Sequence, residues 1–251
     1  MTSINDILAN FEPIDLAQMD SVKLMDRTDT KFSFSFHRLP FILGKLSQFY
    51  RVLRVEGTSL CSYKTLYYDT SELKLYMAHH NERANRYKIR HRNYVDSHLG
   101  FMEVKFKNNK GRTIKKRIVQ PEQGGVLSEE AKKFISETSD IDPSSLEPSV
   151  WINYQRITLV GAAERVTIDI NLEFVQNGLH LPMKNLAIAE VKQSKLSPSP
   201  IFEILKEEKL RETSISKYCL GIISTRPLVK QNNFKQKIST IKKITDDRNI
   251  K

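Results

Sequence analysis

Six short segments of this chain place charged side chains at every second position, with apolar side chains between most of them. The segments cover residues 27–32, 88–92, 101–107, 113–118, 165–172 and 188–192. A β-strand turns successive side chains to opposite faces of a sheet, so this spacing predicts strands with one charged face and one apolar face. Lys105 and Lys107, for example, share a face opposite Val104 and Phe106.

The charged faces carry mainly Lys and Arg, with a few isolated acids. A single strand of this kind would be an ordinary half-buried strand that shows its polar face to water. Six of them favour an antiparallel sheet closed or nearly closed on itself, with charged faces inside and helices packed on the apolar outside. We therefore predict an α+β fold built on an eight-stranded antiparallel β-barrel tunnel, which is just wide enough for a linear ligand.

Amphipathic or capped segments predict the helices that would cover this barrel. They lie at residues 38–49, 69–77, 128–138, 199–208 and 214–224. Residues 1–226 are predicted to form one domain. Residues 227–251 contain seven Lys or Arg, two Asp and no dense apolar pattern, and carry five of the formal net charge of +11. We predict that they form a loosely attached, basic C-terminal extension.

Composition and missing motifs narrow the function classes. The excess of 40 Lys and Arg over 29 Asp and Glu indicates an anionic partner. Only Cys61 and Cys219 are present, which argues against a disulfide scaffold or a Cys-rich zinc module. The adjacent His79 and His80 are expected to face opposite ways on a strand and not to pair at a metal. The chain has no P-loop, dinucleotide-binding glycine motif or recognisable nucleic-acid module, so nucleic acid is disfavoured as a partner.

It has no apolar run long enough to span a bilayer and no signal peptide, so we expect a cytoplasmic location.

Basic side chains that converge inside a tunnel suit a chain of phosphates, because Arg offers paired donors and Lys a point charge. The isolated acids Glu103, Asp169 and Glu190 suit one or two divalent cations that take phosphate oxygens as further ligands. Phosphoryl transfer needs positioning and charge neutralisation more than covalent help from the protein. The residues alone are therefore compatible with a phosphotransferase or a phosphatase.

Nine short motifs follow one another between about residues 20 and 225. They begin at Asp26, Leu66, Lys88, Glu103, Lys115, Asn153, Arg165, Glu190 and Ser216. No single motif is specific, but in this order they resemble the VTC domain, the catalytic polyphosphate polymerase module of the triphosphate tunnel metalloenzyme, or CYTH-like, superfamily.

This resemblance implies a tunnel of eight antiparallel strands, ATP as phosphate donor, manganese or magnesium as cofactor, and a growing linear polyphosphate. The residues that match its phosphate-binding positions are Lys31, Arg90, Arg92, Lys105, Lys115, Arg156, Arg165, Lys192 and Lys217, and Glu190 matches its metal-binding glutamate. Strand parity favours Lys115, together with Arg117, over Lys116. On the same charged faces we predict that Arg27, Lys88 and Lys107 bind substrate, and that Glu103 and Asp169 join Glu190 at the metal.

Two positions depart from the family pattern. Hydrolytic relatives typically carry E-x-E-x-K on the first strand, where this chain has Arg27, Asp29 and Lys31. The loss of one acid and the gain of a base favour a polymerase over a two-metal hydrolase. A Lys that the pattern places three residues before Lys217 is replaced by Ser214, so one phosphate contact is missing.

The combined prediction is a VTC-type polyphosphate polymerase that binds ATP and polyphosphate. A hydrolase of tripolyphosphate or nucleoside triphosphates on the same fold, and a non-catalytic polyphosphate-binding module, remain open as alternatives. Because polymerase domains of this type can work beside a membrane channel, a separate membrane-protein partner is part of the prediction. The oligomeric state stays open.

Overall fold

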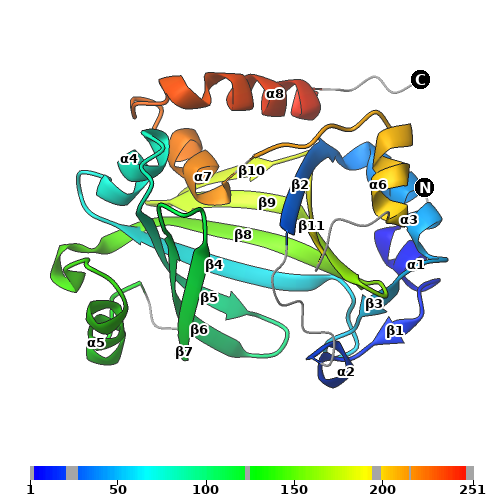
Figure 1. Ribbon diagram of the computed structural model, residues 1–251, viewed down its shortest axis with the longest axis horizontal. Helices are drawn as coiled ribbons and strands as arrows, with labels where there is room; N and C mark the ends of the chain where they lie inside the picture. The colour runs from blue at the N-terminus through cyan, green and yellow to red at the C-terminus, as the bar shows by residue number, and fades with distance from the viewer. Residues whose placement is uncertain (1–2, 21–27, 122–124, 194–198, 215, 247–251) are drawn as a thin grey trace.

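The computed structural model describes residues 3–20, 28–121, 125–193, 199–214 and 216–246. Eight antiparallel strands follow one another in one sheet (Figure 1), in the order β2, β11, β9, β8, β4, β5, β6, β7. Their bounds are β2 (Thr28–Ser35), β4 (Cys61–Asp69), β5 (Arg86–Tyr94), β6 (Leu99–Lys107), β7 (Thr113–Val119), β8 (Glu147–Val160), β9 (Glu164–Gln176) and β11 (Leu186–Gln193). The predicted α+β fold with eight antiparallel strands is confirmed.

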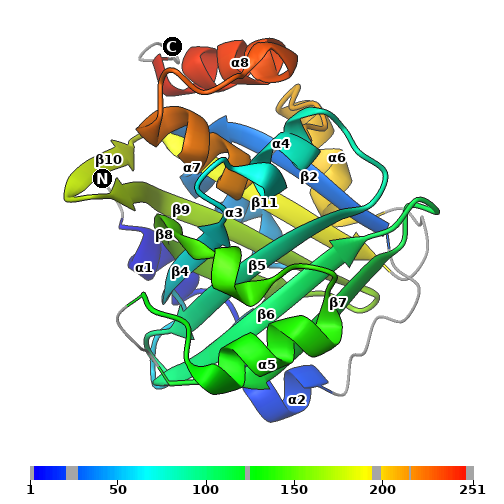
Figure 2. The same ribbon diagram turned by 90° about the vertical axis from the view of Figure 1, so that its left-hand side faces the viewer.

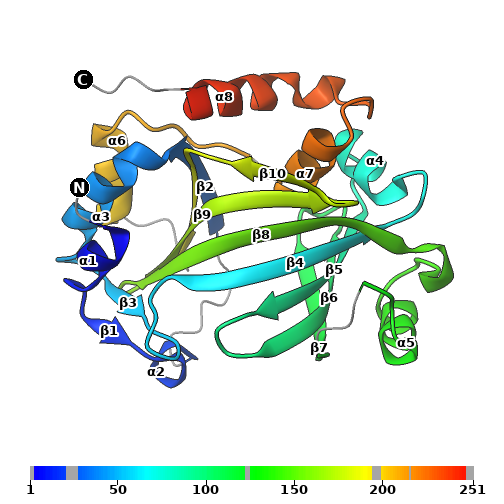
Figure 3. The same cartoon turned by 180° about the vertical axis from the view of Figure 1, so that it is seen from behind.

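The sheet curls into a barrel that stays open along one seam (Figures 1 and 3). Its end strands β2 and β7 are not paired with each other in the described part of the chain. The outer edge of β2 is partly covered by residues 212–213, where the backbone N–H of Thr213 donates to the carbonyl of Lys31 at 2.7 Å. Three short strands extend the sheet elsewhere, namely β1 (Pro13–Ile14), β3 (Arg51–Leu53) and β10 (Leu179–Met183).

Helices cover the convex, apolar face of the sheet. Helices α1 (Ile4–Leu8), α3 (Leu39–Leu46) and α6 (Pro200–Glu207) pack over β2, β9 and β11. Helix α5 (Glu129–Thr138) lies across β6 (Figure 2) and packs on Met102 and Val104. The short helix α2 (Leu16–Asp20) follows β1. Within the described residues, no helix is long and apolar enough to cross a bilayer.

The concave face of the sheet is divided into a charged half and an apolar half. Along β11, Leu186 and Ile188 are followed on the same face by Glu190 and Lys192. Along β9 the change is made by a bulge opposite residues 153–155, where Asn171 has a φ of +52°. The extra residue moves the side chains that follow it to the other face of the strand. The concave face that carries Asp169 before the bulge therefore carries Leu172 and Phe174 after it.

Helix α7 (Lys217–Thr225) packs on the apolar half of the concave face. Its position is fixed by the buried carboxylate of Asp69 at the end of β4, which accepts hydrogen bonds from the phenol of Tyr218 and from the backbone N–H groups of Leu75 and Tyr76. The latter two belong to helix α4 (Lys74–His80). The first residue of α7, Lys217, is thereby held at the border of the charged half.

The predicted loosely attached C-terminal extension is in fact docked. Helix α8 (Lys235–Asp246) starts near α4 and α7 and packs on β2 and β11 (Figure 1). The phenol of Tyr76 donates to the carbonyl of Lys230 at 2.8 Å, and the amide of Asn233 donates to the carbonyl of His80 at 2.9 Å. The sequence expectation missed the apolar stripe of Ile238, Ile241 and Ile244, which is hidden among lysines but has helical spacing.

The pair His79 and His80 was expected on a strand and lies instead at the end of α4. His80 is fully buried and its ring meets the ring of Phe234 edge-on at 5.5 Å. His80 therefore joins α4 to the segment that leads into α8, whereas His79 lies 3.3 Å from the backbone carbonyl of Tyr87 in β5 and lines a cavity described below.

Candidate functional site

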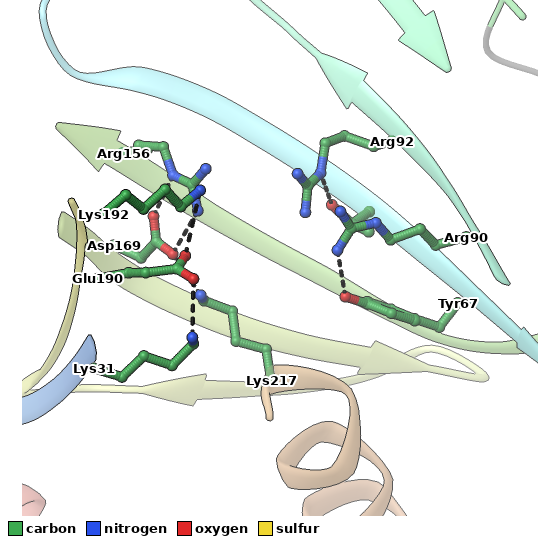
Figure 4. A network of polar contacts seen from close by, with 10 residues as sticks. Lys31, Tyr67, Arg90, Arg92, Arg156, Asp169, Glu190, Lys192 and Lys217 are labelled. Atoms are coloured by element: carbon green, nitrogen blue, oxygen red, sulfur yellow. Dashed lines mark hydrogen bonds and ion pairs between the residues drawn. The ribbon is translucent and has the colours of Figure 1, made fainter. Parts of the chain in front are cut away.

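Three carboxylates on the concave face are each paired with two basic side chains. Arg90 Nε donates to Glu103 Oε2 at 2.6 Å, and Lys115 forms an ion pair with the same carboxylate. Arg156 makes a bidentate contact with Asp169 at 2.6 and 2.9 Å, and Lys217 contacts Asp169 from α7. Glu190 lies 2.9 Å from Lys31 Nζ and 3.8 Å from Lys192 Nζ. Figure 4 shows the last two groups converging opposite Arg90 and Arg92.

The three acids differ in accessibility. The side chains of Glu103 and Asp169 are 0% and 3% exposed, whereas that of Glu190 is 22% exposed. Burial by itself raises the pKa of each, but the neighbouring cations outweigh it and lower the pKa of Glu103 and Asp169 to about 2 and that of Glu190 well below its usual range. All three are therefore ionised at neutral pH, and only Glu190 is open to a ligand.

Burial and the crowding of like charges disfavour the protonated, charged form of the lysines of β6 and β7 and so lower their pKa as well. Burial, with Lys88 and Arg90 nearby, lowers the pKa of Lys105 to about 8. Burial also lowers the pKa of Lys115 to about 8, although Glu103 opposes the shift. A phosphate bound beside these lysines would stabilise their protonated forms.

Two side chains of β4 that the sequence analysis did not single out hold the arginines of β5. The guanidinium of Arg90 donates to the phenol of Tyr67 at 2.9 Å, and that of Arg92 to the hydroxyl of Thr65 at 3.4 Å. Burial raises the pKa of Tyr67, but Arg90, Arg92 and Lys88 outweigh it and lower the value to about 8. The alternation of Tyr63, Thr65 and Tyr67 on one face was the available signal.

The basic side chains line two cavities at the two ends of the charged half. The wide cavity, of about 1200 Å³, is lined by Asp29 and by Lys31, Lys88, Lys105, Lys107 and Lys115. The narrow cavity, of about 180 Å³, is lined by Arg156, Arg165, Lys192, Thr158 and Thr167 together with Tyr63 and Tyr94. Glu190 pairs with Lys31 of the wide cavity and with Lys192 of the narrow one, so it stands between the two.

Of the other residues named from the sequence, Arg165 and Ser214 belong to these cavities, whereas Arg117 is not part of either lining. Arg165 donates to the backbone carbonyl of Met19 in α2 at 3.2 Å. Arg117 is exposed, and its guanidinium lies 4.5 Å from the centre of the Phe101 ring. Ser214 lines the wide cavity, so the position that lost a lysine does belong to the site. Arg27 lies outside the described residues.

The donor set bears on how a divalent cation could be held. Within the described ranges, no three His, Cys, Asp or Glu side chains gather around one point. Glu190 is the accessible carboxylate, and Mn²⁺ or Mg²⁺ accepts oxygens of a bound phosphate as further ligands. The residues present therefore fit a cation held jointly by Glu190 and substrate, and do not fit a site made by protein alone.

No curated protein matches the chain. Among solved structures, an adenylate cyclase candidate from Vibrio parahaemolyticus is 11% identical with a TM-score of 0.48, over 80% of this chain and 99% of that one. An adenylyl cyclase candidate from Hippeastrum, described as having a dominant triphosphatase activity, is 13% identical with a TM-score of 0.45, over 83% and 99%. Scores below 0.5 mark partial similarity. The sequence model of the VTC domain, by contrast, matches residues 26–226, four fifths of the chain. The chain therefore belongs to the VTC domain family.

Proposed function

We propose that the protein is an ATP-dependent polyphosphate polymerase. The terminal phosphate oxygen of a polyphosphate chain attacks the γ-phosphorus of ATP and forms a new P–O–P bond. The bond between the γ-phosphorus and the β,γ-bridging oxygen breaks, and ADP leaves with the bond's electron pair. One ATP and a chain of n phosphates thus give one ADP and a chain of n + 1 phosphates.

The observation that carries this proposal is the basic lining that runs from the wide cavity to the narrow one. Lys88 and Lys105 lie at the wide end, Arg156 and Arg165 at the narrow end, and Glu190 between them. A hydrolase of triphosphates needs one basic pocket. A track with basic residues at both ends can hold a donor triphosphate on one side of the reacting phosphorus and an acceptor chain on the other.

The arginines supply fixed positive charge where negative charge is shared in the transition state. Arg90 is held by Glu103 and Tyr67, and Arg156 by Asp169, so neither needs to reorganise when phosphate binds. We assign Glu103 and Asp169 to this positioning role and Glu190 to the metal. When bound, Mn²⁺ or Mg²⁺ would neutralise charge on the phosphate oxygens beside Glu190.

Incubation of the purified chain with ATP and Mn²⁺ tests the proposal. Products are resolved on a polyacrylamide gel stained for polyphosphate, and free phosphate is assayed in parallel. We expect a ladder of long chains from the natural protein and from K242Q, which alters an exposed lysine on α8. We expect no ladder from R90A or E190Q.

Two outcomes would replace the proposal. Orthophosphate without longer chains would identify a hydrolase, and binding of tripolyphosphate without turnover in any divalent cation would identify a binding module. Cytoplasmic location and a separate membrane-protein partner remain predictions, which cell fractionation and cross-linking would test.

A further inference from the structure

The wide cavity has one wall that the family match does not include. The match ends at residue 226, and helix α8 begins at Lys235. Phe234, Lys237, Ile238 and Ile241 nevertheless line the wide cavity, beside Ile223 of α7. A helix outside the matched residues therefore forms part of the wall of the phosphate-binding cavity.

This added wall differs chemically from the one it faces. The strand wall presents lysines from β5, β6 and β7, whereas the helix wall is mainly apolar. A polyphosphate chain has no apolar surface, so contact with the helix wall would give it no hydrophobic stabilisation. A nucleotide has both parts, since its base and ribose can cover apolar side chains while its phosphates reach the lysines.

The wide cavity is large enough for a nucleotide and carries positive charge on both walls. Its volume of about 1200 Å³ exceeds the roughly 300–1,000 Å³ of ordinary small-molecule pockets. Lys237 lies 5.6 Å from the centre of the Phe234 ring. Lys237 and Lys88 line the same cavity, so the helix wall adds a cation to the phosphate-binding side.

We propose that the apolar wall formed by α7 and α8 binds the nucleoside of the triphosphate donor, with Ile238 in contact with the base or ribose. The donor's phosphates then extend toward Lys88 and Lys105, and the polyphosphate chain occupies the narrow end. This inference rests on the proposed function, because it identifies a nucleotide as the ligand of the wide cavity.

The test compares ATP with tripolyphosphate, which has the phosphates and lacks the nucleoside. Binding of each to the full chain is measured by calorimetry with Mn²⁺ present. The variant I238N places a neutral polar group on the cavity wall, and S239N makes the matched change at the next residue, which is exposed. We expect I238N to weaken ATP binding roughly fivefold, the loss of about one buried methylene or slightly more, with tripolyphosphate and S239N unaffected.

Because Ile238 also packs against the core, I238W provides a second variant that keeps its apolar contacts and occupies part of the space beside the helix wall. It should also weaken ATP binding and spare tripolyphosphate. Equal loss for both ligands, or no loss for either, would overturn the nucleoside site. If the natural protein bound neither ligand, the proposed function itself would fail, and the two failures are thus distinguishable.

Discussion

The two ends of the tunnel carry charge of the same sign but hold it differently. At the narrow end, Arg156 is fixed by both oxygens of the buried Asp169. At the wide end, Lys88 and Lys105 are lysines with a single flexible ammonium group, in a cavity several times larger. Arg presents a rigid fork, whereas Lys is an adaptable point charge. The narrow end is therefore organised before phosphate arrives, and the wide end adapts to what it receives.

The largest expected effect is on stability and comes from the narrow end. R156M leaves the carboxylate of Asp169 buried with only Lys217 as a partner. We expect a loss of about 3 kcal/mol in the free energy of unfolding, because removal of one partner leaves a buried charge poorly compensated. Urea denaturation measures this free energy. The control K192M removes a more accessible cation and should cost less than about 1 kcal/mol. Equal losses of stability in R156M and K192M would show that Arg156 is not held more firmly than the lysine.

Metal binding should distinguish Glu190, which stands between the two cavities, from the buried Glu103. E190Q should weaken Mn²⁺ binding in the presence of tripolyphosphate by about tenfold or more, since it removes the accessible carboxylate. E103Q should leave Mn²⁺ affinity unchanged, because Glu103 is fully buried beneath Arg90 and Lys115. Electron paramagnetic resonance of free Mn²⁺ gives both constants. A similar loss of Mn²⁺ affinity in E103Q would mean that Glu103 is also a metal ligand.

The wide end should show the stronger pH dependence. Lys105 and Lys115 have pKa values lowered to about 8, so they are protonated below this pH and lose their charge above it. Affinity for tripolyphosphate should therefore fall by roughly tenfold between pH 7 and pH 9. The variant K105R keeps its charge and should show a shallower fall. The ligand's own titration cancels in this comparison, and identical pH profiles would exclude Lys105 as a cause.

The smallest effect is expected at the rim of the wide cavity. K237Q removes the cation that α8 contributes, and Lys237 is only partly buried. We expect a two- to threefold loss of tripolyphosphate affinity, about the value of a solvent-screened contact. The loss should vanish in high salt. K242Q on the exposed face of α8 serves as the control, and an equal loss there would mean that only net charge matters.

The alternation of side chains along a strand predicts much of the site from the sequence. The two-residue period correctly places Glu190 and Lys192 on one face of β11 and Ala189 and Val191 on the other, because that strand is regular. Parity does not predict the bulge at Asn171, since a bulge depends on which residues the partner strand presents.

Contacts between elements that are distant in the sequence could not be predicted from local patterns either. Nothing in the sequence around Tyr67 shows that β5 brings Arg90 to within 2.9 Å of its phenol. The basic extension reads as loosely attached until Tyr76 and His80 supply the surface that anchors it. In both cases the local pattern is ambiguous, and tertiary packing decides between its meanings.

The end of the sheet at β7 has a consequence for solubility. An edge strand offers unpaired backbone groups to other chains, and Ile114 and Val119 on this strand are exposed. The run Lys115-Lys116-Arg117 lies between them. Two copies that met edge to edge along β7 would bring these cations together without a counterion. The charges that would attract phosphate from inside the barrel thus also guard its open seam against self-association, and high concentrations of polyphosphate should weaken that protection.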